Sequence, residues 1–307
     1  MASGSLDSVK PKAEREPTLF EMEKPGDAAE LAADLNLQRE YSEANLYLGT
    51  SSFTADGWAG SFYPKGMQPR GYLSHYAKTF RTVEIDSTFY ATPSEATVLN
   101  WYQRTPADFV FAVKVPQVIT HEKVLQDCGQ ELDEFKSRME LLGEKLGPVL
   151  FQFPFFSGKQ FRNVNEFVRR LESFLKKAQG TGWKIAIEIR NEKLLDGALR
   201  GMLRERNVAL ALTDTSFLPR PWEMTAKCEL MTADFVYVRW LGNRKDIEKQ
   251  TTTWDKTVVD RREDLRNWVE LFRQFMKRDV KVYAYANNHY AGNGPNTVRL
   301  FWDMWKG

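Results

Sequence analysis

The sequence predicts an α/β protein of the TIM type: an N-terminal extension followed by eight parallel strands closed into a (β/α)8 barrel. Short runs of β-branched, aromatic and aliphatic residues recur eight times after residue 45, and helix-like segments separate most of them. Such alternation implies parallel pairing with right-handed crossovers. Eight units in about 260 residues match the usual size of this barrel. An open doubly wound sheet is the alternative, weakened because no glycine-rich phosphate loop follows the first run.

The eight runs are each short enough for one strand and are separated by turn-forming or helix-forming residues. They cover residues 46–53, 82–90, 109–116, 147–154, 183–190, 208–215, 234–241 and 279–287.

The predicted helices lie between these runs and after the last one. They cover residues 69–80, 94–104, 131–146, 163–179, 194–206, 261–278 and 296–305. The segment 261–278 has the clearest amphipathic spacing, with apolar residues on one side. Pro219, Pro221 and Trp222 interrupt the link between the sixth and seventh strands, so a loop with a short helix at most is expected there.

The extension, residues 1–45, is predicted to be flexible and acidic, with one short helix over residues 28–37. It holds five Lys or Arg and ten Asp or Glu, which gives it a charge of −5. Because the whole chain has a net charge of +2, the single domain 46–307 carries about +7. A mildly basic domain suits an anionic ligand, although an ordinary solvated surface is the simpler explanation, and the charge falls short of a nucleic-acid signature.

No run approaches the length of a membrane-spanning helix, and no apolar stretch follows the N-terminal charges, so a secretory leader is not expected. Its two cysteines, Cys128 and Cys228, match no metal-binding pattern. A reduced cytoplasmic setting is the expectation.

Strand alternation predicts which side chains point into the barrel. In six strands the apolar residues share one parity, which leaves charged, amide and tyrosine side chains on the inward parity, mostly late in each strand. Unpaired buried charges are costly, so these groups either pair with one another or face a wet cleft at the C-terminal ends, where barrel active sites lie. The inward set is Glu84, Asp86, Lys114, Gln152, Glu188, Arg190, Tyr237, Arg239, Tyr283, Tyr285 and Asn287.

The same residues lie in motifs through which the chain resembles the YecE-like family, also called domain of unknown function 72, over residues 46–305. The resemblance implies a TIM-type barrel and a site at these positions, and it implies no particular reaction. The motifs are Gly49-Thr50-Ser51, Gly57-Trp58, Phe62-Tyr63-Pro64, Val83-Glu84-Ile85-Asp86-Ser87-Thr88-Phe89-Tyr90, Phe111-Ala112-Val113-Lys114, Thr120-His121, Leu146-Gly147-Pro148-Val149-Leu150-Phe151-Gln152-Phe153-Pro154, Glu188-Ile189-Arg190, Asp214, Tyr237-Val238-Arg239 and Tyr283-Ala284-Tyr285-Ala286-Asn287-Asn288.

The chain departs from the family pattern at several positions. Ser52-Phe53 replaces the usual Gly-Trp, and Ala286 replaces a Phe. Asp86 stands where Asn is usual, and Asn191 where His is common. The exchanges at Asp86 and Asn191 add an acid and remove an imidazole, which alters the proton-transfer groups near the expected site.

Four residues are the catalytic candidates. Glu84 and Glu188 can act as general acid and base if their environments separate their pKa values, or they can simply pair with the cations. His121, in the loop after the third strand, can move protons near neutral pH or be an ordinary surface residue. Lys114 can contact an anion or, less readily beside acids, form a Schiff base.

The remaining candidates are expected to bind substrate. Arg190 and Arg239 suit phosphate or carboxylate oxygens, and tyrosines can stack on a ring or merely pack. The substrate-binding set is Asp86, Tyr90, Gln152, Arg190, Asp214, Tyr237, Arg239, Tyr285, Asn287 and Asn288.

A cofactor is not identified by the sequence, and no metal ligand is assigned. The oxygen-rich acids at the site would suit Mg or Mn if a metal were bound.

Two classes of function follow, with a third kept open. The leading expectation is an enzyme that performs acid–base chemistry on a phosphorylated or carboxylated small molecule. The alternatives are a nucleic-acid-binding or phosphodiester-processing barrel and a non-catalytic ligand-binding protein.

Overall fold

The structure, a computed structural model, describes residues 39–156, 160–161 and 163–307. In this part of the chain nine strands form one curled sheet in the order β1-β2-β9-β8-β7-β6-β5-β4-β3. All neighbours from β2 onward are parallel, and only the short β1 is antiparallel to β2. The strands are β1 Ser42–Glu43, β2 Leu46–Thr50, β3 Thr82–Ile85, β4 Val110–Lys114, β5 Leu146–Gln152, β6 Ile185–Glu188, β7 Ala209–Thr215, β8 Phe235–Gly242 and β9 Lys281–Ala286.

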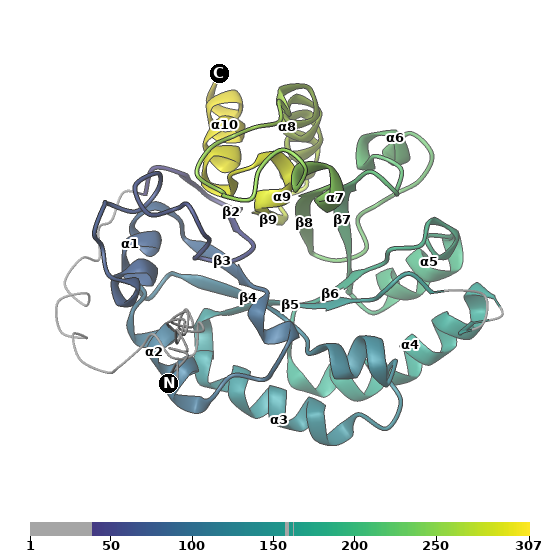
Figure 1. The fold of residues 1–307 in the computed structure, drawn as a ribbon. Coiled ribbons are helices and arrows are strands. Elements are labelled where there is room, and N and C mark those ends of the chain that lie inside the picture. The colour runs from purple at the N-terminus through teal and green to yellow at the C-terminus, as the bar shows by residue number, and fades with distance from the viewer. Residues whose placement is uncertain (1–38, 157–159, 162) are drawn as a thin grey trace, which may run out of the picture.

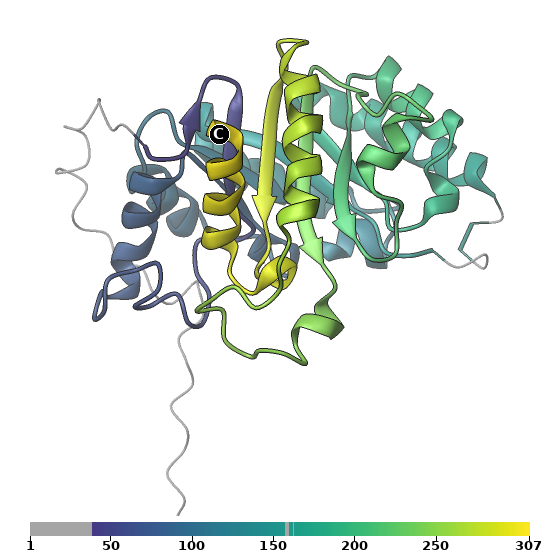
Figure 2. The ribbon, with the colours of Figure 1, turned by 90° about the horizontal axis from the view of Figure 1, so that it is seen from above.

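Helices surround the outside of this curled sheet (Figures 1 and 2). The helix caps follow the sequence locally: Ser94, Asp196 and Asn293 each accept a backbone N–H through their side chains at the start of a helix. The helices are α1 Tyr72–Thr79, α2 Glu95–Gln103, α3 Gly129–Met139, α4 Val164–Ala178, α5 Gly197–Glu205, α6 Pro221–Thr225, α7 Arg244–Ile247, α8 Arg262–Met276, α9 Asn288–Ala291 and α10 Gly294–Lys306.

The eight predicted strands and seven predicted helices are all present, with shifted ends. The strand expected over residues 82–90 ends at Ile85, because Ser87–Phe89 forms a 3₁₀ turn. The proline-rich link after β7 contains only the short helix α6, as expected. The sequence did not indicate β1, α7 or α9, which are single short segments without a periodic pattern.

The curl brings β2 beside β3, although no ladder of backbone hydrogen bonds joins them in the described chain. A side chain at Gly49 would collide with the carbonyl oxygen of Thr82, so only glycine permits this approach. The Tyr76 hydroxyl accepts the Thr50 N–H at 2.9 Å and donates to the Thr82 carbonyl at 3.1 Å. Tyr76 therefore connects the two strands across this seam.

The packed part of the chain begins before residue 46. The Arg39 guanidinium donates to both oxygens of Asp108 at 2.5 and 2.8 Å, and Tyr41 stacks on Phe80 at 5.4 Å. Residues 39–45 thus belong to the folded unit rather than to the flexible extension predicted for 1–45. The helix expected over residues 28–37 lies outside the described residues.

The inner face of the sheet changes character along the strands. A compact cluster of aliphatic and aromatic side chains fills the inner face just below the polar groups. On three strands the inward-pointing residue two positions before the polar one belongs to this cluster: Ala112 precedes Lys114, Leu150 precedes Gln152, and Ala186 precedes Glu188. The polar groups are therefore held at the C-terminal ends of the strands. We call this end of the curled sheet the mouth.

Candidate functional site

Arg239 on β8 is the centre of a buried ion network. Its guanidinium donates to Glu84 on β3 at 2.7 Å and to Glu188 on β6 at 2.6 Å. The Tyr237 hydroxyl donates to the second oxygen of Glu84 at 2.6 Å. All four side chains are fully or almost fully buried. The two carboxylates are thus neutralised across the sheet, as buried charges require.

Glu188 is held in its ionised form. Burial alone would raise its pKa, but the positive charges of Arg239, Arg190 and Lys114 outweigh that effect and hold the pKa at about 2. The hydrogen bond from Arg239 acts in the same direction. A carboxylate of this kind is a poor proton donor near neutral pH, so Glu188 is better suited to orienting the two arginines than to acid–base catalysis.

Lys114 at the end of β4 remains outside this network. Its ammonium lies 3.6 Å from the centre of the Phe89 ring, and within the described residues it forms no ion pair and no side-chain hydrogen bond. Burial, reinforced by the charge of Arg239, lowers the pKa of Lys114 to about 8. Lys114 is a cation that can lose its proton close to physiological pH.

Asp86 follows β3 and caps the turn Ser87–Phe89 without a side-chain hydrogen bond. Burial, followed by the negative charge of Glu84, raises the pKa of Asp86 to about 6, although Arg239 and Lys114 oppose the shift. Asp86 and Lys114 therefore titrate on the two sides of neutrality, which is the arrangement that acid–base chemistry uses.

His121 lies on a single π-helical turn, Val118–Glu122, after β4. Its Nε2 is 3.3 Å from the amide nitrogen of Gln152, and its Nδ1 is 2.8 Å from the Thr120 hydroxyl. Because an amide nitrogen only donates, Nε2 accepts and Nδ1 carries the proton. Burial and the charges of Lys114 and Arg190 lower the pKa of His121 to about 4, so the ring is neutral at pH 7.

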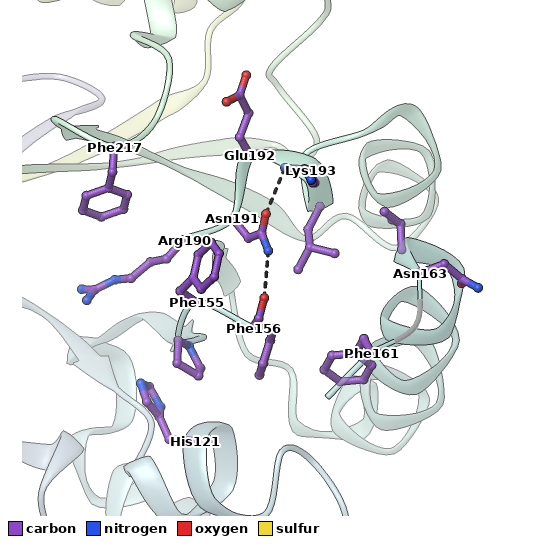
Figure 3. Close-up of a pocket in the computed structure, with 13 residues that line it drawn as sticks. His121, Phe155, Phe156, Phe161, Asn163, Arg190, Asn191, Glu192, Lys193 and Phe217 are labelled. Atoms are coloured by element: carbon purple, nitrogen blue, oxygen red, sulfur yellow. Dashed lines mark hydrogen bonds between the residues drawn. The ribbon is translucent and has the colours of Figure 1, made fainter. Parts of the chain in front are cut away.

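Arg190 connects the ion network to a cavity of about 1120 Å³. Its Nε donates to Glu188 at 3.0 Å, while 37% of its side chain stays exposed. Figure 3 shows its guanidinium extending below Phe217. The cavity is lined by His121, Pro154, Phe155, Phe156, Phe161, Asn163, Val164, Arg190, Asn191, Glu192, Lys193, Leu194 and Phe217.

Three polar atoms of the inner face are buried without a hydrogen-bond partner in the described chain: Ser51 Oγ, Thr215 Oγ1 and Arg239 Nε. Strand register places Thr50 opposite Ala286 and Thr213 opposite Arg239. Ser51 and Thr215 therefore lie just beyond the ion network, toward the mouth. Buried polar groups of this kind normally find partners, so they indicate capacity for a polar ligand.

Asp214 is not brought to this cluster. It has the parity of Leu210 and Leu212 and points into the layer between the sheet and the helices. There it pairs with Arg220 and accepts hydrogen bonds from Trp268 Nε1 at 3.0 Å and the Tyr290 hydroxyl at 2.8 Å. The predicted contact of Asp214 with substrate has no support, because the side chain lies between the sheet and the helices.

The other expected binding residues lie at different depths. The buried Tyr285 hydroxyl is 2.9 Å from the Thr82 hydroxyl, far down the inner face. Asn287 caps α9 through its side chain. Asn288 accepts from Trp58 Nε1 at 3.2 Å and from the Gly294 N–H at 2.8 Å, so its oxygen is engaged. Tyr90 is exposed after β3.

Sequence reasoning missed the aromatic wall of the cavity. Phe155 and Phe156 follow β5, and Phe217 follows β7, beyond the strands to which alternation applies. For Phe155 and Phe156 the signal was an aromatic pair directly after the strand predicted over residues 147–154, where turn and loop residues are usual.

Neither a metal site nor a membrane span is indicated by the described residues. No three His, Cys, Asp or Glu side chains gather there in a way that could hold an ion. Within the same residues, every helix is too short or too polar to cross a bilayer. The possibility of Mg or Mn therefore gains no support from the ligand geometry.

Comparisons with known proteins point to one family. The model of the family described as protein of unknown function DUF72 matches residues 47–307. The UPF0759 protein YecE of Escherichia coli K12 is 38% identical over 82 residues, which are 27% of this chain and 30% of that protein. The UPF0759 protein YunF of Bacillus subtilis 168 is 34% identical over 117 residues, 36% of this chain and 40% of that one. The matched stretches thus span less than half of these curated relatives.

Solved structures extend the likeness to most of the fold. A DUF72 family protein from Thermotoga maritima MSB8 is similar with a TM-score of 0.66 and 25% identity, over 85% of this chain and 99% of that chain. A DUF72 family protein from Enterococcus faecalis V583 gives a TM-score of 0.63 at 19% identity, over 85% and 96% of the two chains. The second likeness concerns the fold alone.

Proposed function

Because the chain belongs to the DUF72 family over residues 47–307, we propose that the polar mouth described above is an enzyme site. It binds an anionic small molecule, phosphorylated or carboxylated, and transfers protons to and from it. The family supplies the fold, and the proposal rests on the chemistry of this chain's own side chains.

The unpaired state of Lys114 is the observation that carries this proposal. A network that only sealed the sheet would engage every charge it contains. Here Arg239 satisfies Glu84 and Glu188, yet Lys114 and Asp86 remain without ion pairs among the described residues. Its charge acts on His121, which lines the cavity, and a buried cation without a counter-ion is a suitable partner for an oxyanion.

Each mouth residue then has a specific role. Arg190, oriented by Glu188, presents its guanidinium to a ligand oxyanion. Lys114, with its pKa at about 8, donates a proton or stabilises negative charge, and Asp86, with its pKa at about 6, accepts a proton. The neutral His121 contributes a hydrogen-bonding ring at the cavity wall.

We also propose that the curled sheet works as a TIM-type (β/α)8 barrel. The eight parallel strands follow one another in chain order, and Tyr76 links β2 to β3 where a ladder would otherwise close the ring. The site would then occupy the C-terminal face on which barrel enzymes place their catalytic groups.

A metabolite screen tests the proposed activity. Pools of phosphorylated and carboxylated metabolites are incubated with the full chain in deuterated buffer, and NMR follows turnover or proton exchange. For any hit, Lys114→Met and Asp86→Asn should each lower the rate at least 100-fold, the usual scale for losing a proton-transfer group. Lys249→Met, the same change at an exposed lysine that follows α7, should leave the rate unchanged.

The outcomes separate the alternatives. Saturable anion binding without turnover would favour the non-catalytic ligand-binding protein. Binding of single- or double-stranded nucleic acid that weakens steeply with salt would favour a nucleic-acid-binding or phosphodiester-processing barrel. A small-molecule site is preferred because the aromatic and cationic side chains line one cavity.

A further inference from the structure

Large apolar side chains are exposed at the mouth. Among the described residues the large hydrophobic side chains that remain exposed are Tyr90, Leu99, Phe155 and Phe217. Three of them are aromatic, and each of these follows the C-terminal end of a strand: Tyr90 after β3, Phe155 after β5 and Phe217 after β7. Exposed apolar groups gathered at one place commonly mark a binding surface.

Phe155 and Phe217 line the same cavity as Arg190 and His121. Phe155 is 67% exposed and Phe217 is 53% exposed. In Figure 3 the Phe217 ring lies above the guanidinium end of Arg190, and the Phe155 ring lies near the backbone end of the same side chain. The cation is therefore accompanied by two aromatic surfaces that the protein's own core leaves uncovered.

Phe155 is held in place by its neighbour. Phe156 is buried, and its ring packs against those of Phe161 at 4.9 Å and Phe167 at 5.6 Å. The carbonyl of Phe156 also accepts from the Asn191 side chain at 3.1 Å. Burying Phe156 in this way leaves Phe155 directed into the cavity (Figure 3).

Phe217 lies in a loop that is closed by an ion pair. Asp214 pairs with Arg220, and these residues lie three positions before and three after Phe217. Asp214 is itself fixed by Trp268 and Tyr290 on two helices. The ion pair thus closes the loop that carries the exposed ring.

The cavity is too large for a bare anion. Its volume of about 1120 Å³ is on the scale that holds a drug-sized ligand. An inorganic phosphate on Arg190 would leave both phenylalanine rings in water. A ligand that adds a flat ring to the anion would cover them, and aromatic pairs gain energy beyond the area they bury.

Resting on the proposed function, we infer that the ligand of this site is an anion attached to a planar aromatic ring, an aryl or heteroaryl phosphate or carboxylate. Arg190 in the cavity wall receives the anion, and Phe155 and Phe217 receive the ring. This assigns the cavity a substrate class and assigns the two phenylalanines a role in specificity.

Three phosphate probes test the inference by isothermal titration calorimetry at pH 7: inorganic phosphate, phenyl phosphate and cyclohexyl phosphate. Phenyl phosphate should bind at least tenfold more tightly than inorganic phosphate, with cyclohexyl phosphate between them because it is apolar but not planar. Phe155→Ala and Phe217→Ala should each weaken phenyl phosphate about tenfold and leave inorganic phosphate unchanged. Leu99→Ala removes an exposed apolar side chain from α2 and should change neither.

Equal binding of phenyl and inorganic phosphate would overturn the inference, as would unchanged phenyl phosphate binding in both phenylalanine variants. The proposed function would survive either result if inorganic phosphate bound the wild-type chain and lost affinity in Arg190→Gln. If none of the three probes bound the wild-type chain, both the inference and the anion site itself would be rejected.

Discussion

The ammonium of Lys114 lies 3.6 Å from the centre of the Phe89 ring, and no carboxylate of the described residues pairs with it. In the same sheet, Arg239 is paired with both Glu84 and Glu188. The charges at the C-terminal ends of the strands thus divide by pairing. A closed network joins β3, β6 and β8, whereas Lys114 lies outside it and Arg190 lines the cavity.

Because Arg239 is at the centre of the closed network, we expect its substitution to lower the stability of the fold strongly. Arg239→Met would leave two buried carboxylates without their cation, so the free energy of unfolding should fall by about 3–5 kcal/mol. Arg190→Met is the matched control: Arg190 is 37% exposed and makes one ion pair, so the loss should be about 1 kcal/mol or less. Urea unfolding measures both, and equal losses would contradict this difference between the two arginines.

Glu188 predicts a pH dependence of stability. Its pKa is lowered from 4.5 to about 2 in the folded chain, so its contribution is present above pH 4.5 and is lost as pH falls toward 2. Glu188→Gln should cost on the order of 3 kcal/mol at pH 7, and the difference from wild type should shrink through this window. Unfolding curves at pH 7, 4.5 and 3 check this; a difference that stays constant would show that the charge of Glu188 is not responsible.

Asp214 predicts a link between stability and ligand binding. Asp214→Asn weakens the buried pair with Arg220, so unfolding should become easier by about 3 kcal/mol. Because that pair closes the loop of Phe217, affinity for phenyl phosphate should fall as well. Asp260→Asn makes the same change in an exposed pair with Arg262 and should cost about 0.5 kcal/mol or less. Loss of stability without loss of affinity would separate Asp214 from the site.

Strand alternation predicted most of the inner face. It assigned Lys114, Glu188 and Arg239 to one side of the sheet, and the structure places them there, because apolar neighbours at every second position define the outer face. Which charges pair could not be predicted. The bonds of Arg239 to Glu84 and Glu188 join β3, β6 and β8, and those contacts depend on long-range register.

Asp214 and the cavity wall show where the pattern was incomplete. Alternation with Leu210 and Leu212 places Asp214 on the outer face. Asp214 is also one of the family motifs, and that resemblance led to the prediction that it binds substrate. Phe155 and Phe217 lie in loops, whose conformation depends on distant anchors such as Phe156 and Arg220 rather than on a local period. The loop residues that shape ligand specificity were therefore the least predictable part of the site.

Sulfate affinity as a function of pH is the most direct test of the open mouth. Sulfate keeps its charge between pH 6 and pH 9, so any change reports the protein. Since the pKa of Lys114 is about 8, affinity should fall roughly tenfold as pH rises from 7 to 9, on the scale of one lost charge-assisted hydrogen bond. Lys114→Met should bind sulfate more weakly at pH 7 and lose this step, whereas Lys249→Met should retain it. Sulfate binding that is independent of pH, or a step that persists in Lys114→Met, would contradict the account.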